Sequence, residues 1–62
     1  MQHVFEFILD HNVETEEGSS INRVHEYYIT QSSRKTKVAK KILKEKGITI
    51  NNVENFQLRK IR

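Results

Sequence analysis

Apolar and polar residues alternate near the start of the chain, in the segment HVFEFILDH. Phe5, Phe7 and Leu9 fall on one side of this segment if it is extended, because successive side chains of a strand point to opposite faces. The aromatic and branched apolar residues of the segment suit a pleated, half-buried surface. The pattern therefore predicts a β-strand with one face turned towards a core.

A second segment of the same character, INRVHEYYIT, follows the polar stretch ETEEGSS. Two β-rich segments joined by a short polar stretch that contains glycine predict a β-hairpin. If the hairpin is centred on Glu17, the apolar residues of both strands share one face, as a consistent register requires. The expected opposite pairs are Phe7 with Tyr27, Phe5 with Ile29, and Leu9 with His25.

Apolar residues at helical spacing come next, and they predict a helix over Ser33–Lys46. The apolar stripe of this helix consists of Val38, Ala39, Ile42 and Leu43. Ser32 or Ser33 is expected to cap the start, because a hydroxyl accepts hydrogen bonds from the amides of the first turn. Gly47 is expected to end the helix in the left-handed backbone conformation, which glycine adopts at little cost.

The last segment, ITINNVENFQLRKIR, has Phe56 and Leu58 at alternate positions, as in a strand. A helix is disfavoured here because the side chains of the three asparagines compete for backbone hydrogen bonds. We therefore expect a turn at Asn51–Asn52 and a strand from Val53 to Ile61. Placing this strand beside the first one puts the most apolar strand in the centre and makes every neighbouring pair antiparallel.

These elements predict a single α+β domain over residues 1–62, a small ββαβ fold whose three-stranded antiparallel sheet is covered on one face by the helix. The residues expected to form the core with the helix stripe are Phe5, Phe7, Leu9, Tyr27, Ile29, Phe56 and Leu58. A chain this short buries only about 60% of the surface that its unfolded form exposes, and it has no cysteine for a disulfide. Oligomerisation is another common aid to stability, so a homodimer is expected.

The face of the sheet away from the helix has no element left to cover it. The side chains expected on this face are Val4, Ile8, Val24 and Tyr28, rimmed by Glu6, Asp10 and Glu26. Exposed apolar patches on so small a sheet often mark an interface. An alternative function is therefore a protein-interaction or assembly module that uses the open sheet face or an edge strand.

Charge is distributed unevenly along the chain. Residues 1–31 hold six acids and one base, whereas residues 32–62 hold ten bases and two acids. Such asymmetry favours contact with nucleic acid or a membrane surface. A membrane suits this chain less well, because the apolar face of the helix is needed for the core and lacks large aromatic anchors.

The predicted helix has a basic side, and the candidate nucleic-acid-binding residues on it are Arg34, Lys37, Lys40, Lys41 and Lys44. Few acids are interleaved with them, although Glu–Lys pairs four residues apart stabilise helices, and the helix dipole disfavours bases in the first turn. Three interpretations remain open: an anionic partner, a plain solvated face, and a match with acids of the same chain or a second copy. DNA or RNA is the expected anion, because bases gain affinity by releasing counterions from phosphates.

No residue pattern indicates catalysis or metal binding. His3 and His11 lie about 26 Å apart on an extended strand, no catalytic signature is present, and a domain of this size is not expected to hold a pocket of about 300 Å³. We therefore expect a non-enzymatic protein without a cofactor, a metal or a small-molecule substrate. No apolar run approaches the roughly 20 residues of a membrane span, and a chain without cysteine fits a cytoplasmic location.

Overall fold

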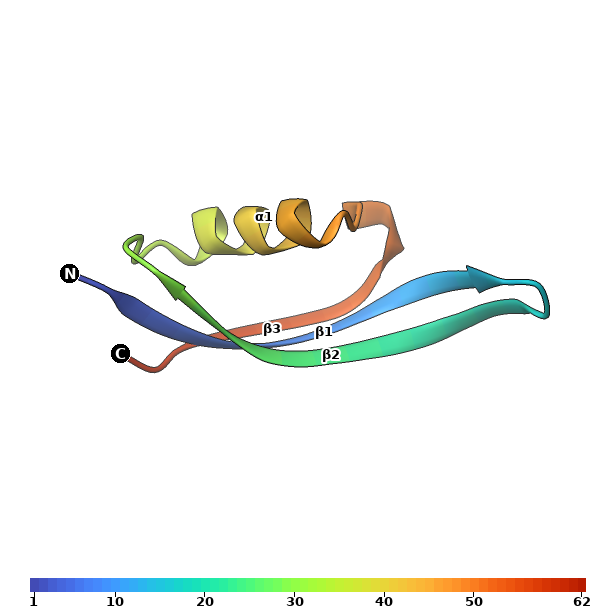
Figure 1. Cartoon of the computed structure of the whole chain (residues 1–62), viewed down its shortest axis with the longest axis horizontal. Coiled ribbons are helices and arrows are strands. Elements are labelled where there is room, and N and C mark those ends of the chain that lie inside the picture. The colour runs from blue at the N-terminus through green and yellow to red at the C-terminus, as the bar shows by residue number, and fades with distance from the viewer.

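A computed structural model describes all 62 residues as two layers, a three-stranded antiparallel sheet and one helix (Figure 1). The elements are β1 (His3–Thr15), β2 (Gly18–Thr30), α1 (Lys35–Lys46), the short 3-10 helix η1 (Ile50–Asn52) and β3 (Val53–Lys60). The strand order is β2-β1-β3, with the most apolar strand in the centre. The predicted α+β class, ββαβ order and position of the third strand are confirmed.

The register of the hairpin differs by one residue from the predicted one. Glu16 and Glu17 alone form the turn, and Thr15 lies opposite Gly18, which has a φ of 122°. Neither glutamate has a positive φ, so the turn is not one of the primed types that hairpins favour. The positive φ falls instead on Gly18, where glycine adopts it at little cost. The observed opposite pairs are Phe5 with Tyr28, Phe7 with Glu26, and Leu9 with Val24.

A slip of one residue moves every side chain of β2 to the other face of the sheet. Tyr27 and Ile29, which were predicted in the core, therefore lie on the face away from α1, where they are 64% and 63% exposed. Val24 and Tyr28, which were predicted on the uncovered face, pack against the core instead. The placement of Glu26 on the uncovered face is also wrong, because it shares the core side with these two residues.

The core lies between α1 and the sheet, and most of it is as predicted. Its six buried residues are Phe5, Phe7, Leu9, Val38, Ile42 and Leu43. Phe56 packs edge-on against Phe7, with 6.2 Å between the ring centres. Burial of large apolar side chains contributes about 1.5–3 kcal/mol each, so this small cluster holds the two layers together.

The helix ends as predicted but begins differently. Gly47 has a φ of 68°, its N–H bonds the carbonyl of Lys44 at 3.2 Å, and the N–H of Ile48 bonds that of Leu43 at 3.0 Å. At the start, the cap position is Arg34 and no side chain caps the first turn. The predicted serine cap is therefore wrong: α1 begins at Lys35, and the Ser32 hydroxyl accepts a hydrogen bond from the N–H of Arg34, at 3.4 Å, rather than from an amide of the first turn.

Strands β1 and β2 continue well past the end of β3. The pairing of β3 covers only residues 5–11 of β1, so residues 12–21 form a two-stranded arm that projects beyond the helix (Figure 1). The molecule measures 45 × 16 × 14 Å, and its radius of gyration is 12.6 Å, against about 10.6 Å for a compact domain of this length. The polar stretch predicted as a loop is thus mostly strand.

Candidate nucleic-acid interface

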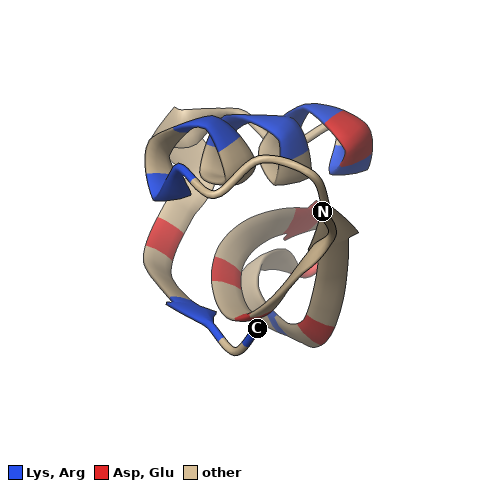
Figure 2. Cartoon of the chain, turned by 90° about the vertical axis from the view of Figure 1, so that its left-hand side faces the viewer, with Lys and Arg blue, Asp and Glu red and all other residues tan.

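The five candidate residues lie together on the outer side of the helix layer. We call Arg34, Lys37, Lys40, Lys41 and Lys44 the basic face. All five are exposed, while Val38, Ile42 and Leu43 on the other side of α1 are buried against the sheet. Figure 2 shows basic residues along the helix, with the acidic residues mainly on the strands.

No residue of the basic face has an acidic partner within the chain. The ion pairs of the structure join Arg23 to Asp10, Lys46 to Glu26, and both His25 and Arg59 to Glu6. The basic face contributes to none of these contacts. Matching with acids of the same chain, one of the three interpretations left open by the sequence, therefore does not account for these five charges.

The one acid of the helix is directed towards the sheet. Glu45 accepts a hydrogen bond from the Tyr28 hydroxyl, and this bond, followed by burial, raises the pKa of Tyr28 above its usual value. Its neighbour Lys46 also turns inwards, with Nζ 2.7 Å from Glu26 and 5.9 Å from the centre of the Phe7 ring. Glu45 is exposed, but its carboxylate is bonded to Tyr28 and forms no ion pair with a residue of the basic face.

The first turn of α1 adds to the positive potential of this side. It contains no acidic residue and has no side-chain cap, so no side chain satisfies the N–H groups that the start of a helix leaves without a partner. Arg34, Lys35 and Lys37 lie at the same end, where the helix dipole disfavours each positive charge by about 0.3–1 kcal/mol. The sequence of this end of the helix therefore supplies no negative charge to offset these bases.

On the sheet, by contrast, Glu6, Asp10 and Glu26 each have a basic partner. We call the side of the sheet away from α1 the open face. On it, Asp10 is only 9% exposed and accepts two hydrogen bonds from Arg23, at 2.8 and 3.0 Å, and one from Asn55 at 3.5 Å. These contacts cross strands through the observed register, which is why the sequence alone did not reveal them.

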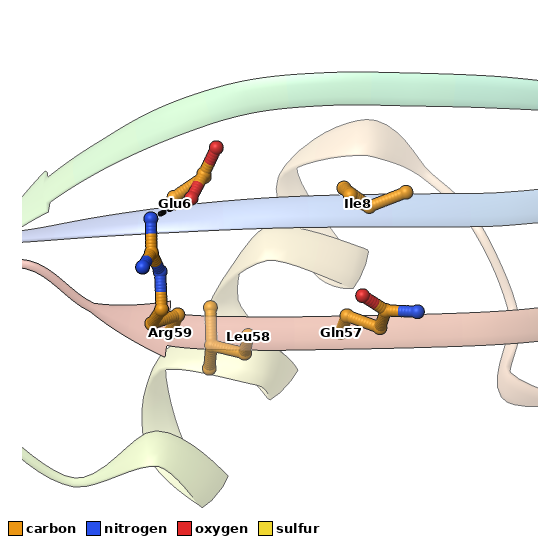
Figure 3. Close-up of a pocket in the computed structure, with 5 residues that line it drawn as sticks. All are labelled: Glu6, Ile8, Gln57, Leu58 and Arg59. Atoms are coloured by element: carbon orange, nitrogen blue, oxygen red, sulfur yellow. Dashed lines mark hydrogen bonds and ion pairs between the residues drawn. The ribbon is translucent and has the colours of Figure 1, made fainter.

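A second acid of the open face, Glu6, is held in the same way. Its carboxylate lies 2.7 Å from His25 Nε2. It also lies 2.7 Å from Arg59 Nη2, a contact that Figure 3 shows. Hydrogen bonds from His25 and then from Arg59 lower the pKa of Glu6, and the bonds from Arg23 lower the pKa of Asp10. Both carboxyl groups therefore favour the folded state in their ionised form.

These lowered pKa values predict that the domain loses stability in acid. Above about pH 5 both groups are ionised in the folded and unfolded chains, and their contribution is complete. As the pH falls below about 4, the unfolded chain takes up protons that the folded chain does not, and the contribution is lost as the pH passes the folded pKa values. Melting curves between pH 7 and pH 2 should therefore show a falling midpoint.

The variant Glu6→Gln/Asp10→Asn serves as the control for this acid effect. Its melting temperature should be lower at neutral pH, and its dependence on pH should be weaker than that of the wild type. Equal pH dependence in the two proteins would show that these carboxylates are not coupled to folding.

The open face also contains a groove of about 350 Å³ between β1 and β3. It is lined by Glu6, Ile8, Gln57, Leu58 and Arg59 (Figure 3). The expectation of no space above about 300 Å³ is therefore wrong. The groove does not offer a free acid or base, because its carboxylate and guanidinium bond each other.

No cluster of three or more metal-ligating side chains occurs, and no helix is long and apolar enough to span a membrane.

No protein-family model, curated protein or solved structure matches the chain significantly. Its function is therefore inferred from its own side chains.

Proposed function

We propose that the protein is a small, non-enzymatic nucleic-acid-binding module that contacts phosphates through the basic face. The observation that supports this proposal is the set of five exposed bases on one side of one helix, none of which has an acid of the chain within ion-pairing distance. Of the other bases, Arg23, Lys46 and Arg59 have such partners, whereas Lys35, Lys60 and Arg62 do not. A cytoplasmic location, based on the cysteine-free composition, is part of the same proposal.

The energetics of the helix also favour an external anion. Like charges three and four residues apart destabilise a helix by a few tenths of a kcal/mol per pair, and the uncapped first turn adds an unfavourable dipole term. In a domain whose core has six buried residues, such costs are a noticeable fraction of the total stability. Binding to a polyanion offsets them, because each neutralised phosphate releases a counterion.

The length of the basic face suits a nucleic-acid backbone. From Arg34 to Lys44 the helix rises by about 15 Å, which matches about four successive phosphates of one DNA strand at 3.4 Å each along the axis. Lysine side chains meet phosphates as point charges and carry little base information. The expected binding is consequently weak, dependent on salt and nearly independent of sequence.

A salt titration with short duplex DNA tests this function. Four or five phosphate contacts predict a slope near −4 for the logarithm of the binding constant against the logarithm of salt concentration, from about −0.9 per phosphate. Fluorescence anisotropy between about 50 and 200 mM salt measures the slope, and duplex RNA and single strands define the preferred nucleic acid. Absence of binding at about 50 mM salt would contradict the proposal and leave the bases as a solvated face.

A further inference from the structure

The open face of the sheet is the largest part of the molecule for which neither the fold nor the proposed function provides a role. Tyr27 and Ile29 on β2 lie on it directly across from Glu6 and Val4 of β1. The two β2 side chains are more than 60% exposed, and Ile8 continues the apolar surface along β1. This surface lies on the opposite side of the molecule from the basic face.

The exposed area of the chain exceeds that of a compact monomer. Its accessible surface is 4868 Å² for 7.4 kDa, whereas a typical monomer of that mass exposes about 4,200 Å². The difference, about 650 Å², includes the arm that projects beyond the helix as well as the open face. A second copy that covers the open face lowers this exposed area, and a standard interface removes roughly 800 Å² from each partner.

The charges of the open face favour a protein partner over a nucleic acid. Glu6 and Asp10 place two carboxylates on it that balance the charges of Arg23 and Arg59, so this face has no excess of positive charge to attract phosphates. Both are already bonded to Arg23, His25 or Arg59 of the same face, so covering them leaves neither carboxylate without a partner. Unpaired buried charges are what make such burial costly.

The open face has both a protruding side chain, which we call the projection, and a groove, which we call the hollow. Tyr27 projects from the edge strand β2, while the groove lined by Glu6, Ile8, Gln57 and Arg59 lies over β1 and β3. Since neighbouring strands are about 4.8 Å apart, the two features are separated by up to about 10 Å across the sheet. A two-fold axis places each projection against the hollow of the other copy, as an interface between identical surfaces requires.

We propose that the protein forms a homodimer in which two open faces pack together and Tyr27 of each copy lies in the groove of the other. Packed sheets lie about 10 Å apart with interdigitating side chains, so Ile29, Val4 and Ile8 fill the space around the ring. The two helices then lie on the outside, and their basic faces point away from each other. This assembly does not depend on whether the basic faces bind nucleic acid.

Sedimentation equilibrium on the full chain tests the dimer. At about 100 μM, where a dimer of micromolar affinity is nearly complete, the mass should be twice the 7.4 kDa of the chain. Tyr27→Lys removes the projection and Gln57→Lys places a charge in the groove, and each should reduce the mass to that of the monomer. The control Ile50→Lys adds the same charge at a residue that is 72% exposed on η1, and it should leave the dimer intact.

Circular dichroism establishes that each variant is folded before its mass is interpreted. A wild-type monomer at this concentration would overturn the proposal. A dimer that survives both Tyr27→Lys and Gln57→Lys would also overturn it, because the copies would then be joined by another surface, such as the edge of β2.

Discussion

Replacing Phe7 with alanine should unfold the domain. Phe7 lies in the central strand, is 1% exposed, and contacts the ring of Phe56 and the ammonium of Lys46. Truncating a buried phenylalanine costs about 3–5 kcal/mol. A single core in a chain of this size rarely supplies more than about 3–5 kcal/mol of net stability, so the loss is comparable to the whole.

Far-UV circular dichroism during thermal and urea unfolding measures this effect. Ile50→Ala is the matched control, since it also truncates a large apolar side chain but at a position that is 72% exposed. The control should melt close to the wild type. A Phe7→Ala variant that melts within a degree or two of the wild type would mean that the two-layer core described here is wrong.

Reversing two charges of the basic face should abolish binding to nucleic acid while leaving the fold intact. In the variant Lys37→Glu/Lys41→Glu, both side chains are exposed and neither makes an ion pair, so nothing is lost inside the domain. An acid near the start of α1 suits the helix dipole, and the change also relieves repulsion between neighbouring lysines. The melting temperature should therefore stay level or rise as binding disappears.

A charge-matched pair of variants separates a specific surface from overall charge. Lys37→Gln/Lys41→Gln and Ser19→Glu/Ser20→Glu both lower the net charge by two, the first on the basic face and the second on the arm. The first should reduce the salt slope from near −4 to near −2, at about 0.9 per lost contact. The second should leave the slope near −4. Equal losses in the two variants would mean that net charge, and not the basic face, governs binding.

The hydrophobic pattern predicted the elements of this fold but not how β2 pairs. The segment Tyr27-Tyr28-Ile29 carries large apolar side chains on both faces of the strand, with Tyr28 and Val24 on one face and Tyr27 and Ile29 on the other. Either face of β2 could therefore be turned towards the core, and the hydrophobic pattern does not determine which one is. The choice is made by a two-residue turn at Glu16–Glu17, which polarity alone describes only as a loop.

The sequence of the helix similarly predicted which bases are exposed. It did not predict which of them form ion pairs with acids. Glu45 is neighbour to Lys41 and Lys44 in sequence, yet it bonds Tyr28, whose position depends on the register of the hairpin. The cross-strand bonds of Glu6 and Asp10 depend on the same register. The spacing of the bases in the sequence was therefore enough to locate the basic face. That its residues have no acidic partner could be established only from the positions of the strands in the structure.

The arm has a consequence for how the protein meets a charged surface. Its tip carries Glu14, Glu16 and Glu17 at one end of a 45 Å axis, while both termini, including Arg62, lie towards the other end (Figure 1). Together with the basic face, this arrangement places negative charge at the tip of the arm and positive charge away from it. A polyanion turns such a molecule during diffusion, so encounters begin with the helix and the arm points into solvent. The association rate, and not only the affinity, should therefore fall steeply as salt screens these charges.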